Sequence, residues 1–125
     1  MRLFVFGVGY SVAAYVRRYR RDWDEIAGTT QSLGKARQIE AETPGFKALV
    51  FDDASADPQI EPLLARSDAL LVSVPPRAAD PALHRFGTAI RSSGIRRIVY
   101  LSTLGVYGDA NGGWVDESTP PDPAV

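Results

Sequence analysis

The sequence opens on a short apolar segment that ends in two glycines and passes directly into a helical pattern. Residues 3–6 have the composition of a buried strand, Gly7 and Gly9 follow them, and Ser11 stands where a helix would begin. Glycine at such a turn lets the backbone bend sharply and lets a ligand approach without a Cβ in the way. The next helix directs unpaired N–H groups and its positive dipole end at the same point. This order of elements predicts a βαβ unit with an anion-binding turn.

Apolar segments of strand length alternate with segments of helical period, which is typical of a parallel sheet covered by helices. The expected strands are residues 3–6, 25–29, 47–51, 69–74 and 97–101, and the expected helices are residues 11–21, 33–42, 59–66 and 81–93. Right-handed crossovers then give an α/β fold, a Rossmann-type doubly wound parallel sheet with strand order 3-2-1-4-5. We expect one domain over residues 1–108 and a loop or tail over residues 109–125.

Two expected helices carry apolar residues at helical spacing, which predicts the faces that they bury. In the first helix these residues are Val12, Tyr15, Val16 and Tyr19, with Trp23 just beyond, and in the last they are Leu83, Phe86 and Ile90.

The predicted layout leaves part of the sheet uncovered. On the face of the first two helices, nothing covers the fourth and fifth strands, although a parallel sheet normally buries both faces. We therefore expect the domain to be incomplete at its C-terminus, with further chain or a partner supplying the missing layer.

Composition limits the chemistry and the partners. The 125 residues include no cysteine and one histidine, so thiolate catalysis is excluded and no metal site is expected. The formal net charge of −1 gives no general attraction to nucleic acid or to an anionic membrane. Apolar runs are shorter than the roughly 20 residues of a membrane-spanning helix, and no charged leader precedes the first strand. We expect a cytoplasmic protein, and we expect His84 to be a solvated residue of the last helix.

The glycine turn in its βαβ context predicts a dinucleotide, and we expect Gly7, Gly9, Tyr10 and Ser11 to bind its diphosphate. Val12 departs from the third glycine of the fingerprint, where close packing favours a small residue. A structural turn without a ligand is the alternative.

The end of the second strand bears on the choice between NAD and NADP. An acidic residue there would bind the ribose 2′-hydroxyl and repel a 2′-phosphate. The sequence instead has Thr30, Gln31 and Ser32, with Lys35 and Arg37 shortly after. These donors favour NADP over NAD; the alternative is that the two cations are simply solvated.

Three further residues follow strands at the same edge of the sheet. Asp52 either accepts a hydrogen bond from the adenine amino group or caps a turn. Val74 and Pro75 end the fourth strand at the topological switch point, where open α/β sheets bind ligands. We expect all three to contact the cofactor.

The residues after the fifth strand carry a family resemblance. The run from Tyr100 to Asp109 reads YLSTLGVYGD, and WVDESTP follows at Trp114. Together with the glycine turn, it resembles the extended short-chain dehydrogenase/reductase superfamily, and within it the NAD-dependent epimerase/dehydratase group. The resemblance implies a nicotinamide cofactor and hydride transfer with a sugar-nucleotide-like or other alcohol or ketone substrate. It also implies that Ser102 lies beside the cofactor and that the Thr103 hydroxyl holds the substrate oxygen.

The Tyr-x-x-x-Lys pair that supplies the general acid and base in that family is absent from these 125 residues. Tyr107 has no lysine at the required spacing, and the family motif would fall just beyond Val125. Two hypotheses stay open. The chain is either the NAD(P)-binding portion of an epimerase/dehydratase-like oxidoreductase, or a non-catalytic NADP-binding sensor or scaffold. The oligomeric state is open as well, with a homodimer among the alternatives.

Overall fold

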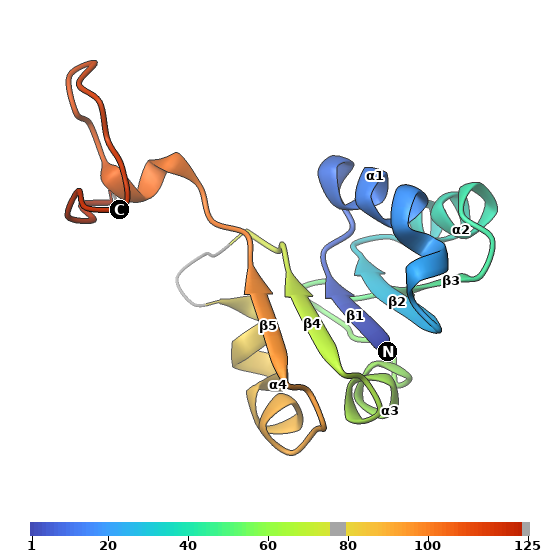
Figure 1. Cartoon of the computed structure of the whole chain (residues 1–125). Helices are drawn as coiled ribbons and strands as arrows, with labels where there is room; N and C mark the ends of the chain where they lie inside the picture. The colour runs from blue at the N-terminus through green and yellow to red at the C-terminus, as the bar shows by residue number, and fades with distance from the viewer. Residues whose placement is uncertain (76–79, 124–125) are drawn as a thin grey trace.

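The computed structural model describes residues 1–75 and 80–123 and contains a five-stranded, all-parallel sheet with the order β3-β2-β1-β4-β5 (Figure 1). The strands are β1 (Arg2–Phe6), β2 (Glu25–Thr30), β3 (Phe46–Val50), β4 (Ala69–Val72) and β5 (Arg97–Tyr100). The helices are α1 (Tyr10–Tyr19), α2 (Leu33–Glu42), α3 (Ile60–Ala65) and α4 (Pro81–Arg91), with short 3₁₀ turns over Arg20–Asp22 and Leu104–Tyr107. The predicted fold class and strand order are confirmed, and the element ends differ from the expected ones by only a few residues.

The central strand β1 shows why the helices form two layers. Its side chains alternate between the faces, as in any strand. Leu3 and Val5 pack with residues of α1 and α2, whereas Phe4 and Phe6 pack with residues of α3 and α4. The sheet is therefore covered on both sides around β1 (Figure 1).

An aromatic cluster fixes α4 against the sheet. The Phe86 ring of α4 stacks on Phe6 with a centroid separation of 5.4 Å and meets the edge of Phe51 at 5.2 Å. Phe51 directly follows β3, so one cluster joins the end of β3, the centre of the sheet and α4. Aromatic pairs in such geometries contribute about 0.5–1.5 kcal/mol each beyond their buried area.

Two expectations about buried helix faces are wrong. Tyr15 and Tyr19 stay 36% and 39% exposed and pack on each other instead of entering the core. Val12 and Val16, which point directly at the sheet, are the buried residues of α1. In α4, Leu83 is 46% exposed, because the buried residues Ala82, Phe86 and Ile90 repeat every fourth position and place Leu83 to one side.

Part of one sheet face carries no helix in the described ranges. On the side of α1, Leu71 is half-buried while Val99 and Leu101 remain 55% and 45% exposed, and we call these three residues the apolar face. Tyr15 and Trp23 border a groove of about 440 Å³ beside it. This gap in the helical layer lies where the sequence predicts it.

After the second 3₁₀ turn, the chain runs as loops and turns away from the sheet (Figure 1). None of the helices in the described part of the chain has the length and hydropathy needed to span a bilayer.

Candidate functional site

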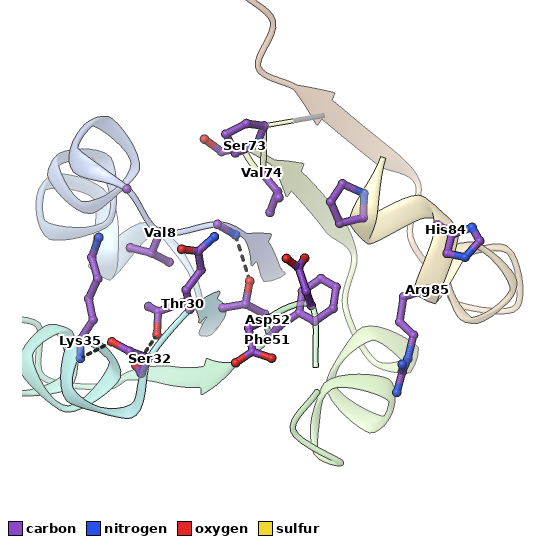
Figure 2. A pocket seen from close by; sticks show the side chains of 17 residues that line it. Val8, Thr30, Ser32, Lys35, Phe51, Asp52, Ser73, Val74, His84 and Arg85 are labelled. Carbon is purple, nitrogen blue, oxygen red and sulfur yellow. Dashed lines mark hydrogen bonds between the residues drawn. The ribbon is translucent and has the colours of Figure 1, made fainter. Parts of the chain in front are cut away.

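A pocket of about 710 Å³ lies where the first four strands end, between the sheet and the start of α4 (Figure 2). We call it the strand-end pocket. It is lined by Gly7, Val8, Gly9, Thr29, Thr30, Gln31, Ser32, Lys35, Phe51, Asp52, Asp53, Ser73, Val74, Pro75, Pro81, His84 and Arg85. Eight of the predicted cofactor-binding residues are therefore brought together: Gly7, Gly9, Thr30, Gln31, Ser32, Asp52, Val74 and Pro75.

Gly7 is required by the fold itself. Its φ of +89° lies in the left-handed region, and a Cβ there would stand 3.0 Å from both Val74 Cγ2 and Val74 N. The Gly7 N–H donates to Thr29 Oγ1 at 3.0 Å, and the Val8 N–H donates to the Thr29 carbonyl at 2.8 Å. The first part of the glycine turn is thus held by β2 and lies close to the residues that follow β4.

Gly9 differs, because nothing in the described chain requires a glycine there. It is the N-cap of α1 with φ −91°, and a Cβ added to it would meet no atom within 4 Å. Among the described residues no side chain caps the helix, and its first turn contains no acidic residue. The first amides of α1, which have no partner within a helix, therefore start at an open edge of the strand-end pocket.

Tyr10 and Ser11 do not lie in the pocket as side chains. Tyr10 is 91% exposed, and Ser11 lines the groove beside the apolar face instead. Through their backbone N–H groups, both residues still belong to the first turn of α1.

Gly28 is a structural residue of the turn that sequence reasoning missed. A Cβ on Gly28 would stand 2.9 Å from Val8 Cγ2 and 3.0 Å from the Val5 carbonyl oxygen. The missing side chain leaves room for Val8 against β2, while the unexpected Val12 is accommodated in the core at 3% exposure. A glycine inside a strand pattern marks such a close approach, so the signal was present in the sequence.

At the end of β2, two predicted residues serve the local fold. The buried Thr30 hydroxyl donates to the Ser32 carbonyl at 3.0 Å. Ser32 is the N-cap of α2, with its Oγ accepting from the Lys35 N–H at 3.2 Å. These bonds fix the backbone that carries Gln31 and Lys35 at the pocket.

The side chains of Gln31 and Lys35 form no hydrogen bond or ion pair with other residues in the ranges 1–75 and 80–123. Both residues line the pocket, and Figure 2 shows the position of Lys35. Arg37 is not among the lining residues. Of the two cations that the sequence grouped together, Lys35 lines the pocket and Arg37 does not.

Asp52 caps a turn and also lines the pocket. Its Oδ1 accepts from the backbone N–H groups of Ser55 and Ala54, at 2.7 and 2.8 Å, and from the Ser55 hydroxyl at 3.3 Å. The Ser55 N–H first, and then the Ala54 N–H, hold the pKa of Asp52 below its ordinary value, since both bonds favour the carboxylate. The carboxylate is therefore charged at neutral pH and leaves Oδ2 available as an acceptor.

The α4 wall of the pocket was not anticipated as part of a site. Pro81, His84 and Arg85 contribute to it (Figure 2), and His84 is exposed, as expected for a solvated residue. No cluster of three or more histidine and carboxylate side chains suited to a metal ion occurs in the described residues.

Ser102 and Thr103 lie apart from the lining of the strand-end pocket. Both are exposed and follow β5, at the start of the segment that leaves the sheet. Thr103 accepts a hydrogen bond from the Val106 N–H through its carbonyl at 3.2 Å. Neither residue is among those that line the pocket, and the role of the Thr103 hydroxyl toward a substrate stays a prediction.

No family model matches the sequence, and no curated protein matches it either. Solved structures do match. A functionally unknown conserved protein from Silicibacter pomeroyi is 33% identical with a TM-score of 0.79, over 99% of this chain and 42% of that one. Yeast methylglyoxal/isovaleraldehyde reductase Gre2, complexed with NADPH, is 19% identical with a TM-score of 0.67, over 87% of this chain and 40% of that one.

WbmG from Bordetella bronchiseptica, in complex with NAD and UDP, is 14% identical with a TM-score of 0.70, over 99% of this chain and 44% of that one. The chain thus spans less than half the length of these three proteins. The structures that it resembles thus include a reductase in complex with NADPH and an enzyme in complex with NAD. These likenesses show the fold, a Rossmann-type parallel sheet with helices on both faces, which is the fold that the motifs predict.

Proposed function

We propose that the chain binds a nicotinamide dinucleotide in the strand-end pocket, with the diphosphate against Gly9 and the first amides of α1. The observation that carries this proposal is the open space at Gly9. Neither backbone conformation nor packing demands a glycine there, whereas a diphosphate that approaches the backbone does. The NADPH in Gre2 and the NAD in WbmG support the same class of ligand.

The remaining pocket residues contact different parts of the dinucleotide. Gln31 and Ser32 bind the adenosine ribose, and Asp52 accepts a hydrogen bond from the adenine. Val74 and Pro75 contact the cofactor at the switch point beside β1. The Thr29 hydroxyl and Gly28 act indirectly, because they hold the glycine turn in its conformation.

NADP is the favoured cofactor in this proposal. The Gln31 amide and the Lys35 ammonium group line the pocket without a partner among the described residues, and both can donate to a 2′-phosphate. No carboxylate follows β2 directly to repel that phosphate.

In its family context, the chain is the NAD(P)-binding portion of an epimerase/dehydratase-like oxidoreductase that acts on a sugar-nucleotide-like or other alcohol or ketone. Residues 1–108 form the nucleotide-binding domain. The cofactor supplies or accepts the hydride, and Ser102 lies beside the cofactor. The Thr103 hydroxyl donates to the substrate oxygen, where it stabilises developing negative charge.

The second candidate is a non-catalytic NADP-binding sensor or scaffold. Both candidates require dinucleotide binding, and they differ in whether these residues work with an acid and a base supplied elsewhere.

A calorimetric titration of the chain with NADPH and with NADH tests the shared proposal. We expect saturable one-to-one binding of both, tighter for NADPH, and competition by ADP-ribose, which contains the diphosphate. Absence of binding of either dinucleotide would contradict the proposal. Turnover of NADPH with ketone substrates, assayed in parallel, favours the oxidoreductase over the sensor.

A further inference from the structure

Arg85 brings a cationic side chain to the strand-end pocket that the proposed contacts leave unused. It lines the pocket from the second turn of α4. In the part of the chain that the structure describes, its guanidinium forms no ion pair or hydrogen bond. The group is therefore available to a ligand.

The position of Arg85 relative to Asp52 is fixed by the core beneath them. Arg85 directly precedes Phe86, which is 3% exposed, and Asp52 directly follows Phe51. The Phe51 and Phe86 rings meet edge to face at 5.2 Å. One aromatic contact thus sets the α4 wall of the pocket against the loop that follows β3.

The charges at this end of the pocket select the kind of ligand group. Asp52 and Asp53 both line it and oppose a phosphate, since two carboxylates repel an anion. An uncharged group with an N–H donor suits the free Oδ2 of Asp52. A flat aromatic surface suits a guanidinium, which stacks on π-systems and is weakly hydrated. A purine base with an exocyclic amino group has both properties.

We infer that Arg85 stacks its guanidinium on the adenine base of the bound dinucleotide while Asp52 accepts the hydrogen bond of the adenine amino group. This inference rests on the proposed dinucleotide site and assigns the α4 wall as the part that selects the base. Arg85 contributes a planar cationic group here, and the plane is the property that a lysine lacks.

The test compares three variants by calorimetric titration with NADPH: Arg85→Ala, Arg85→Lys and, as a matched control, Arg91→Ala. Arg91 lies in the last turn of α4, is exposed and does not line the pocket. We expect Arg85→Ala to weaken NADPH binding about tenfold, within the range of a cation–π contact. We expect Arg85→Lys to lose nearly as much, because lysine keeps the charge but not the plane, and Arg91→Ala to bind like the unmodified chain.

A second ligand tests the contact between Asp52 and the adenine base. The hypoxanthine analogue of NADH lacks the amino group, so the unmodified chain should bind it more weakly than NADH, and Asp52→Asn should reduce that difference. Full affinity in Arg85→Lys, or unchanged affinity in Arg85→Ala, would overturn the inference and leave the proposed site intact. Failure of the unmodified chain to bind NADPH or NADH would overturn the proposed function and the inference together.

Discussion

Gln31 and Lys35 show how a few side chains select between two closely related ligands. The backbone that carries them is fixed by the Thr30 and Ser32 hydrogen bonds, so both side chains start from defined positions at the pocket. Their polar groups are free of other described residues. A ligand phosphate that approaches this corner can accept from the Gln31 amide N–H groups and from the Lys35 ammonium group, and no carboxylate stands at position 31 to repel it.

Replacement of Gln31 by Asp should shift the preference from NADPH toward NADH. The new carboxylate accepts from the ribose 2′-hydroxyl and repels a 2′-phosphate, and we expect the ratio of the two dissociation constants to change by roughly tenfold or more, or at least about 1.4 kcal/mol. Lys35→Ala should weaken the binding of NADPH and leave the binding of NADH unchanged. Arg37→Ala is the control, because Arg37 does not line the pocket, and it should change neither affinity. An unaltered ratio in Gln31→Asp would show that this corner does not face the ribose.

At the scale of elements, a side-chain hydrogen bond, which we call the bridge, joins β5 to the N-cap of α4. The Tyr100 hydroxyl donates to Asp80 Oδ2 at 2.7 Å, and Asp80 Oδ1 accepts from the Leu83 N–H at 2.9 Å as the N-cap of α4. The hydrogen bond to Asp80 is the main cause that raises the pKa of Tyr100 above its ordinary value. The bridge joins the edge strand to the helix that forms one wall of the pocket.

Tyr100→Phe should lower the free energy of unfolding by about 0.5–1 kcal/mol at pH 7, at the lower end for a hydrogen bond because Tyr100 is 42% exposed. The pKa of Tyr100 is higher in the folded state than in the unfolded state. The stabilisation by the hydrogen bond is therefore complete below the unfolded pKa of about 10, and it is lost as the pH rises through the folded pKa. Urea unfolding of both proteins between pH 7 and 11 measures this. The difference between them should shrink above about pH 10, and a difference that stays constant across that range would contradict the bridge.

The sequence predicts the order and type of these elements because both follow from local patterns. Apolar strands, helical periods and right-handed crossovers are enough to place β1 at the centre and Gly7 at its end. Burial of individual helix residues is less well predicted: the spacing of Tyr15 and Tyr19 matches that of Val12 and Val16, but only the valines point at the sheet. Periodicity defines an arc of a helix and does not say which part of it meets a neighbour.

The candidate site was predicted where its residues follow strands and missed where they come from elsewhere. Residues at the ends of β1, β2, β3 and β4 must meet at one edge of a parallel sheet, so Gly9, Gln31, Asp52 and Val74 could be grouped in advance. Arg85 could not, because its place depends on the contact between Phe51 and Phe86, which are 35 positions apart. Such contacts have no local signature.

At the scale of the whole molecule, the apolar face is the part of the sheet that no helix covers in the described chain. Large exposed apolar patches mark contacts with other polypeptide segments, or lead to association. With Val99 and Leu101 about half exposed, we expect the 125-residue chain to self-associate in a concentration-dependent way.

The double replacement of Val99 and Leu101 by Lys should weaken this association by about tenfold, since burial of two half-exposed apolar side chains contributes roughly 1.5 kcal/mol. Leu83→Lys is a matched control, with 46% exposure on α4 and outside the apolar face. Sedimentation velocity over a range of concentrations measures the effect. A monomeric unmodified chain at all concentrations, or equal effects of the control and the double replacement, would contradict the role of this face.

The dinucleotide itself gives the most direct measurement. Gly9→Val should abolish NADPH binding while the fold persists, because a Cβ at this position meets no atom within 4 Å and the valine side chain occupies the space of the diphosphate. Gly87→Ala, at a second glycine with open space around its Cβ and outside the pocket, is the control and should bind normally. Calorimetric titration of the three proteins, with circular dichroism to verify the fold, should show binding lost in Gly9→Val alone; a folded Gly9→Val chain that binds NADPH as tightly as the unmodified one would contradict the site.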